Sequence, residues 1–163
     1  MSAKPLRVFP WLLSLAGMVA VSPLQAGNEL TEGQLLSVVN QVTLGGGPAK
    51  QSDKLSENTP VATGASSFAE IKFKDASLMR LAPDTRLAFQ SKDRSLRLEE
   101  GTVLLNVPHG NGGILVEAGG IQGQVTGTTL MASRDKEGNF SFVILETTGS
   151  AKVTSNTGQT ANL

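Results

Sequence analysis

Few side chains in this chain could carry out chemistry, and they form no recognisable catalytic pattern. There is one histidine, and there is no cysteine or tyrosine. His109 lies in a glycine-rich stretch without a nearby acidic residue, whereas a nucleophilic triad needs its histidine oriented by a third group. We interpret His109 as a solvated loop residue, and we predict that the protein is not an enzyme.

Metal binding and sugar hydrolysis are equally hard to build from this sequence. Asp135, Glu137 and Asn139 alternate like the oxygen ligands of calcium, but the twelve-residue loop signature of such sites is missing. Glu99 and Glu100 are adjacent, so on a strand they face opposite ways and cannot act as the carboxylate pair of a glycosidase. We therefore predict no catalytic residue, no metal site and no cofactor.

Residues 1–26 have the features of a leader that directs export. Lys4 and Arg7 precede an apolar run, which is followed by a segment with a helix-breaking proline that ends in the small residue Ala26. The run is shorter than the about 20 residues that a membrane-spanning helix needs. We predict a signal peptide cleaved after Ala26, with an uncleaved anchor as the alternative. The mature domain, residues 27–163, would work in a bacterial periplasm with no stable membrane span.

The charge balance gives no reason to expect a nucleic-acid partner. The chain has 14 basic and 14 acidic residues, and removing residues 1–26 takes away basic residues only. No basic patch stands out in the remainder. The mature part has the size of one domain, large enough to bury a core without disulfides.

Alternation of apolar and polar residues predicts an all-β fold. Between Ala69 and Lys74 the apolar side chains point one way and the charged ones the other, which is the period of a half-buried strand. We expect further strands at residues 78–81, 87–89, 95–98, 102–107, 114–117, 123–131, 140–146 and 149–154, with turns at 75–77, 83–84, 99–101 and 134–139. Such short, mostly antiparallel strands indicate a single β-solenoid or β-sandwich domain, and both remain open.

The segment before residue 54 is less clear. Residues 30–44 could form an amphipathic helix, but we favour two short strands around Asn40, a residue type that tolerates a positive φ. Residues 45–53 would then be a mobile loop. An open sheet has edge strands that another chain can extend. We expect these edges near residues 38–44 and 151–154.

Six short motifs in the chain carry a family resemblance. They are Asn40-Gln41-Val42, Val61-Ala62-Thr63-Gly64, Asp75-Ala76-Ser77, Met79-Arg80-Leu81 with Pro83-Asp84-Thr85, Leu98 to Val103, and Val125-Thr126-Gly127-Thr128-Thr129-Leu130. Their order and spacing resemble the FecR domain, a bacterial periplasmic β module, over about residues 33–163. The chain departs from the family pattern at Ala76, Leu130 and Thr147, where the family has glycine, an aromatic residue and glycine.

The motif residues have a structural interpretation. Glycines between strands suit turns and close approaches, Asp and Ser side chains cap turns, and Thr suits strand ends. We expect fold-defining rather than catalytic roles for Thr63, Gly64, Asp75, Ser77, Gly101, Gly127 and Thr128.

The resemblance implies a non-enzymatic protein-interaction module in envelope sensing or assembly, with an envelope protein as its unidentified partner. In the best-known relatives a cytoplasmic segment ahead of a membrane span controls a sigma factor. Too few residues precede the apolar run here to form that segment, so we expect no sigma factor as partner. The alternatives are a module that binds the cell wall or a polysaccharide, and a truncated remnant of a longer family member.

Overall fold

The structure is a computed structural model that describes residues 32–90, 94–146 and 148–163. All regular secondary structure in these ranges is β-strand, which confirms the predicted all-β class. The strands are β1 (Gly33–Val39), β2 (Val42–Leu44), β3 (Gly47–Pro48), β4 (Lys54–Leu55), β5 (Pro60–Thr63), β6 (Phe68–Phe73), β7 (Leu78–Leu81), β8 (Arg86–Gln90), β9 (Ser95–Asn106), β10 (Ile114–Ala118), β11 (Ile121–Thr126), β12 (Thr129–Arg134), β13 (Phe140–Ile144), β14 (Ser150–Thr154) and β15 (Thr160–Asn162). Residues 1–26, interpreted as a leader, lie outside the described ranges, in which no helix is long and apolar enough to cross a membrane.

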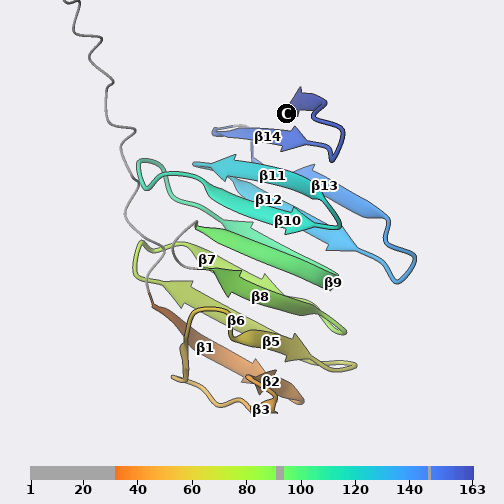
Figure 1. The fold of residues 1–163 in the computed structure, drawn as a ribbon. Helices are drawn as coiled ribbons and strands as arrows, with labels where there is room; N and C mark the ends of the chain where they lie inside the picture. Colours follow the sequence, from red (N-terminus) through yellow and green to blue (C-terminus); the bar gives the residue numbers. More distant parts are fainter. Residues whose placement is uncertain (1–31, 91–93, 147) are drawn as a thin grey trace, which may run out of the picture.

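The strands form one open sheet that is bent into two facing layers (Figure 1). Layer A has the order β4-β1-β6-β7-β9-β12-β13, and layer B has the order β3-β2-β5-β8-β9-β10-β11-β14-β15. β9 belongs to both layers: its first half pairs with β8 and β10, and its second half pairs with β7 and β12. The chain thus winds back and forth between two layers that are open at both ends.

The core lies between the two layers, as the alternation predicts. In β6, for example, Ala69, Ile71 and Phe73 are buried, while the residues between them face outward. The rings of Phe73 in layer A and Phe89 in layer B approach to 5.2 Å between centroids, so the layers are in direct contact. Side chains from nearly every strand join this single core.

β9 continues through residues 99–101, where the sequence predicted a turn between two strands. Glu99 is the extra residue of a β-bulge in the pairing of β8 with β9. Gly101 follows with a φ of 94°, a conformation that costs glycine little. The predicted turn is wrong because the bulge redirects the strand from layer B to layer A without ending it.

The reverse correction applies to residues 123–131, which the sequence predicted as one strand. β11 ends at Thr126 in layer B, and β12 begins at Thr129 in layer A. Gly127, with a φ of 63°, lies between them. An apolar alternation does not reveal such a crossing, because its period is the same in both layers.

At the N-terminal end the structure contains strands rather than a helix, as we favoured. Asn40 has a φ of 59° between β1 and β2. The predicted loop at residues 45–53 is wrong in part, because Gly47–Pro48 forms β3 and pairs with β2. The N–H of Ala49 also donates to the carbonyl of Val42. These hydrogen bonds hold residues 47–49 against β2 at the end of layer B.

Candidate interaction surface

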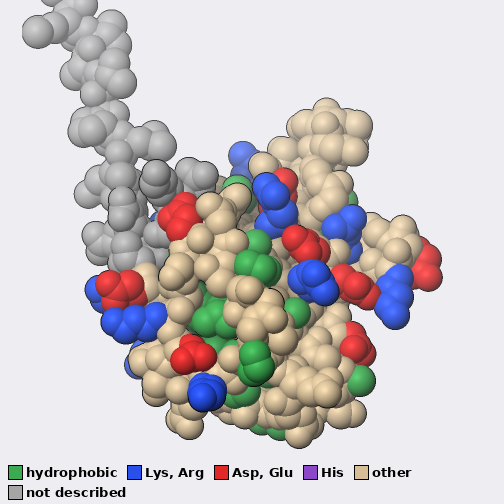
Figure 2. Space-filling model, turned by 60° about the horizontal axis from the view of Figure 1, so that its bottom comes forward, with side chains coloured by type: hydrophobic (Ala, Val, Ile, Leu, Met, Phe, Trp, Pro, Cys, Tyr) green, Lys and Arg blue, Asp and Glu red, His purple; other side chains and the backbone are tan. Residues whose placement is uncertain are grey.

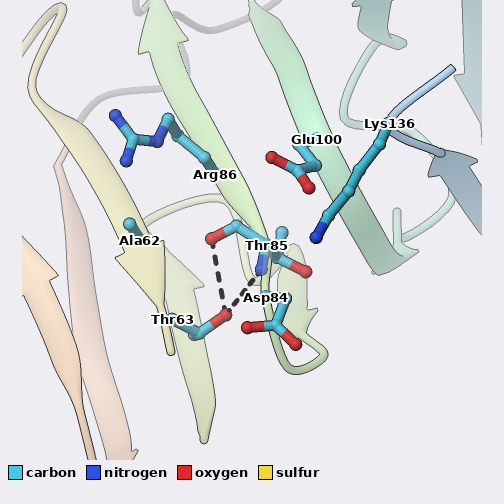
Figure 3. A pocket seen from close by; sticks show the side chains of 7 residues that line it. All are labelled: Ala62, Thr63, Asp84, Thr85, Arg86, Glu100 and Lys136. Atoms are coloured by element: carbon cyan, nitrogen blue, oxygen red, sulfur yellow. Dashed lines mark hydrogen bonds between the residues drawn. The ribbon is translucent and has the colours of Figure 1, made fainter. Parts of the chain in front are cut away.

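A polar hollow of about 250 Å³ lies where β5, β8 and β9 meet (Figure 3). The charged side chains around it are those of Asp84, Arg86, Glu100 and Lys136. Lys136 reaches into the hollow from the connection between β12 and β13, toward Glu100. The four charges balance, so the hollow favours neither an anion nor a cation.

The two threonine hydroxyls at this hollow are already engaged by the backbone. Thr63 Oγ1 donates to the carbonyl of Ala82 at 2.6 Å and accepts from the N–H of Thr85 at 3.0 Å. Thr85 Oγ1 accepts from the N–H of Thr102 at 3.0 Å. In the described structure no hydrogen bond joins either hydroxyl to an acidic, lysine or histidine side chain, as activation of a nucleophile would require. Their geometry is that of a brace between β5, β8 and β9.

Gly64 and Gly101 lie at the same corner as Thr63. The N–H of Gly64 donates to the carbonyl of Gln41. A Cβ on Gly101 would lie 2.4 Å from Thr85 Cα. The structure therefore brings three of the seven motif residues together at one corner, where the chain passes between the layers.

Asp75 and Ser77 lie at another corner, in the hairpin between β6 and β7. The N–H of Ser77 donates to Asp75 Oδ1 at 2.8 Å, and Ser77 Oγ donates to Asp75 Oδ2 at 3.0 Å. Asp75 Oδ2 also accepts from Arg94 Nη2 at 2.7 Å, and both side chains of this ion pair are at least nine-tenths buried. Arg94 Nε donates to the carbonyl of Gly113 at 2.9 Å. Arg94 thereby joins the hairpin of layer A to layer B.

Ala76 offers a direct test of this hairpin, because it stands where the family pattern has glycine. Its φ is 67°, a left-handed conformation that costs a residue with a Cβ about 1–2 kcal/mol. Glycine removes that strain but loses about 0.5–1 kcal/mol of conformational entropy on folding. We expect Ala76→Gly to raise the free energy of unfolding by up to about 1 kcal/mol. Urea denaturation measures this change, and Ala65→Gly is the matched control; a destabilised Ala76→Gly would contradict the account.

Gly127 and Thr128 lie where the chain crosses from β11 to β12. Thr128 Oγ1 donates to the carbonyl of Glu146 at 2.6 Å, and the N–H of Val107 donates to the carbonyl of Thr128. A Cβ on Gly127 would lie 2.4 Å from His109 Nδ1, so the exposed imidazole packs over this glycine. No described acidic side chain hydrogen-bonds to His109, and it has the surroundings of a loop residue.

The hairpin tip at Asp135 to Asn139 closes on itself. Asp135 accepts hydrogen bonds from the N–H and from Nδ2 of Asn139, both at 2.7 Å. These hydrogen bonds lower the pKa of Asp135 because they favour the charged form. No described group of acidic or histidine side chains could hold a metal ion.

The outer face of layer A carries an apolar stripe that the sequence analysis did not identify. Leu104, Met131 and Val143 are direct cross-strand neighbours on β9, β12 and β13. Leu78 and Leu145 lie at the two ends of the neighbouring row, with Asn106 and Thr129 between them, and each is close to one end of the first row. We call the five apolar residues Leu78, Leu104, Met131, Val143 and Leu145 the apolar stripe. A shallow hollow of about 250 Å³ opens beside Leu78 and Leu104. The stripe leaves Val143 38% and Leu145 53% exposed, which is unusual for neighbouring large apolar side chains.

The outer face of layer B differs from that of layer A. Arg97 on β9 pairs with Glu117 on β10, which pairs with Gln122 on β11. Gln124 on β11 pairs in the same way with Lys152 on β14. The two faces of the molecule are therefore unequal, and only the outer face of layer A presents a continuous apolar row among the described residues.

The sheet edges also differ, and both predicted edges are wrong: β2, in the predicted edge at residues 38–44, lies between β3 and β5, and β1 lies between β4 and β6. β14 at residues 150–154 is not an edge, because it lies between β11 and β15. In the described chain the edge strands are β4, β3, β15 and β13. β4 is two residues long and carries Lys54, β3 is two residues long and carries Pro48, and β15 has three small or polar residues. β13 has five residues without charge or proline, next to the stripe.

Charge does not single out any surface for a nucleic acid. Basic and acidic side chains are interspersed over the face seen in Figure 2, with none of the clustering by sign that phosphate binding requires. Arg80 pairs with Glu70, and Lys74 pairs with Glu32 at 3.0 Å. The apolar stripe and the edge of β13 are thus the features that suggest recognition.

A comparison with protein-family models assigns the chain to a known family. The model described as FecR protein matches residues 59–151, from the start of β5 into β14. The chain belongs to the FecR family. No curated protein and no solved structure matches the chain. The match confirms the resemblance stated from the motifs, and membership of the FecR family indicates a signalling or regulatory module of the cell envelope.

The matched range contains all seven FecR motif residues named from the sequence. It leaves out β1 to β4 and β15, which include three of the four edge strands of the described chain. The stripe and β13 lie inside the matched range. A sequence signal for them exists: apolar residues follow one another at 103–105, 130–132 and 142–145, so both faces of these strands are apolar.

Proposed function

We propose that this FecR-family protein is a non-enzymatic interaction module of the periplasm that binds another envelope protein through the outer face of layer A. The observation that carries the proposal is the apolar stripe from Leu78 to Leu145, next to the unprotected edge of β13. We also propose that residues 1–26 are the leader that exports it.

The apolar residues on both faces of β12 and β13 support a partner that covers the apolar stripe. Strands that are apolar on both faces are typical of sheets covered on both faces. Here the inner face of β12 and β13 contacts the core, whereas the outer face is uncovered in the described chain. Covering an apolar side chain contributes roughly 25 cal/mol for each Å² removed from water. A partner that covers the stripe therefore gains binding free energy by removing these apolar side chains from water.

The described polar side chains that could take part in chemistry are engaged in contacts that hold the fold. The hydroxyls of Thr63 and Thr85 are hydrogen-bonded to backbone, and His109 packs on Gly127 without a described acidic partner. The charged residues of the polar hollow balance one another. These arrangements stabilise corners of the fold.

Site-specific photo-crosslinking in cells of the native host tests the proposal. A photoreactive residue at Val143 reports on the stripe, and one at Arg97 reports on the polar face of layer B. We expect Val143 to capture the same envelope protein reproducibly, while Arg97 does not. Leu104→Lys should abolish this capture because it places a charge in the stripe, whereas Leu104→Met should preserve it. Equal capture from both faces, or no capture from Val143, would refute the proposal.

A cell-wall or polysaccharide binding module is the alternative. Sugar sites are commonly built on exposed aromatic rings, and among the described residues only Phe68, 50% exposed, offers one on the surface. Sedimentation with purified peptidoglycan separates the two functions. The interaction module should stay in solution, and co-sedimentation would favour the alternative.

A further inference from the structure

The two layers of the molecule have unequal lengths. Beyond β9, layer A continues with β12 and β13, whereas layer B continues with β10, β11, β14 and β15. Phe142 on β13 lies directly over Gly123 on β11, where an added Cβ would be 2.0 Å from the ring. β13 is thus opposite β11, and β14 and β15 project past the end of layer A, as Figure 1 shows for β14.

The inner face of this projection is apolar and loses its cover with distance from β11. Ala151 on β14 is 5% exposed, Val153 is half-buried, and Ala161 on β15 is exposed. Leu163, whose N–H donates to the carbonyl of Ala151, is on the same side and 58% exposed. We call the space bounded by Val153, Ala161, Leu163 and the edge of β13 the slot.

The edge of β13 offers backbone hydrogen bonds to the slot. The N–H of Leu145 donates to the carbonyl of Thr129, and the pairing of β12 with β13 continues in that register. In an antiparallel ladder the hydrogen-bonded residues alternate, so Ser141 and Val143 bond to β12. The N–H and C=O groups of Phe140, Phe142 and Ile144 therefore point away from β12, toward the position of the next strand.

From Phe142 to Ile144 the side chains on that edge are apolar on both sides. Phe142 and Ile144 point toward the core and are half-buried, and Val143 points outward. Proteins protect free edges with short strands, lysine or proline, as β3 and β4 do here. β13 has none of these devices, which indicates an edge that is covered when the protein functions.

A symmetric second copy does not fit the slot. Antiparallel pairing of two β13 strands about a two-fold axis would continue layer A from one copy into the other. It would also place β11 of the second copy where β14 already lies. A five-residue edge is about 17 Å long, so a dimer held by this edge alone would bury far less than the about 800 Å² per partner of a stable dimer interface. The slot suits one extended segment.

We infer that the slot binds an extended segment of the partner polypeptide, which adds to β13 as a further strand of layer A. The inference rests on the proposed interaction function and names the chemistry of the partner. The segment is about five residues long and has apolar side chains at alternate positions. These face Val153, Ala161 and Leu163, and the backbone of the segment pairs with Phe140, Phe142 and Ile144.

Amide hydrogen exchange measured by NMR tests the inference with a defined probe. The probe is an acetylated and amidated heptapeptide in which threonine and valine alternate, added at millimolar concentration. We expect it to slow exchange at the N–H groups of Phe140, Phe142 and Ile144, whereas Ser141 and Val143 are protected with or without peptide. A peptide of the same composition with its valines consecutive should protect these amides less.

A proline substitution separates backbone pairing from side-chain contact. Ile144→Pro removes an N–H that β12 does not use, so the fold should persist while peptide affinity falls at least about tenfold. Ile144→Ala is the matched control, since it loses the side chain and keeps the N–H. If Ile144→Pro fails to fold, a peptide methylated on alternate backbone nitrogens tests the same hydrogen bonds. Such a peptide has lost the N–H donors on one of its two edges, so it should bind only through its other edge.

Three results would overturn the inference. These are unchanged exchange at Phe140, Phe142 and Ile144, equal binding by Ile144→Pro and Ile144→Ala, and protection without peptide that disappears on dilution. The last would assign the slot to a second copy. Failure here with intact crosslinking from Val143 would remove the strand-addition model alone. Loss of crosslinking with intact peptide binding would instead remove the proposed function.

Discussion

Asp75→Asn is expected to lower the free energy of unfolding by about 3 kcal/mol or more. The substitution keeps an acceptor for the N–H of Ser77 but removes the negative charge that contacts Arg94 Nη2 at 2.7 Å in this buried ion pair. Breaking a buried ion pair by removing one partner costs about 3–5 kcal/mol, because the remaining charge stays desolvated. For a domain of this size the expected fall in Tm is roughly 6–12 °C.

The control for Asp75→Asn is Glu70→Gln, which breaks the ion pair between Glu70 and Arg80. The Arg80 side chain is 59% exposed, so water already solvates its charge. Exposed pairs contribute at most about 1 kcal/mol, and we expect a correspondingly small loss of stability. Thermal unfolding followed by circular dichroism compares the two variants. Equal losses would mean that burial of the Asp75–Arg94 pair has no special role in holding the layers together.

Gly101→Ala is the second substitution with a large expected effect. Gly101 has a φ of 94°, and an added Cβ would lie 2.4 Å from both Thr85 Cα and Thr85 Oγ1. A backbone atom cannot move aside as the end of a flexible side chain can. The added Cβ would also displace Thr85 Oγ1, which accepts a hydrogen bond from the N–H of Thr102. We expect a loss of at least about 3 kcal/mol from conformational strain and displaced packing together.

Gly110→Ala separates the two contributions to this loss. Gly110 has a φ of 84°, close to that of Gly101, but an added Cβ would have no atom within 4 Å. The free energy of unfolding of Gly110→Ala should therefore fall by only about 1–2 kcal/mol, the cost of the left-handed conformation. Urea denaturation of both variants gives the difference, which measures the clash with Thr85. If both lose the same stability, the close approach at the bend of β9 is not a constraint on the fold.

Both large effects come from close contacts at corners of the fold and not from the exposed side chains of the apolar stripe or the slot. Asp75 and Arg94 join layer A to layer B, and Gly101 lets one strand serve both layers. The side chain of Leu104 lies on the outer face of layer A and the N–H of Ile144 lies on the free edge of β13, and no other described strand covers either. Stability and partner binding can therefore be changed independently in this protein.

The sequence by itself determined the local structure of the chain. Alternation of period two predicted β6 and most of the longer strands, although not β3, β4, β5 or β15, and short polar segments predicted the hairpin at Asp75 and the tip at Asp135. These features depend on neighbours within a few residues, so the residue types suffice. The order of the motifs was also sufficient to predict the FecR family, which the match to residues 59–151 confirms.

Only the tertiary structure decided which strands continue without a break and which lie at the edge of a sheet. The chain bends without a break at Glu99, where the sequence predicted a turn, and it crosses between layers at Gly127, where the sequence predicted a continuous strand. β14 is enclosed and β13 is an edge, although both are short and apolar in part. A strand's own sequence records how apolar its two faces are, whereas its place in a sheet depends on partners far away in the chain. For that reason the sequence contained the apolar run of β13, and only the pairing of the layers showed that the run faces an open slot.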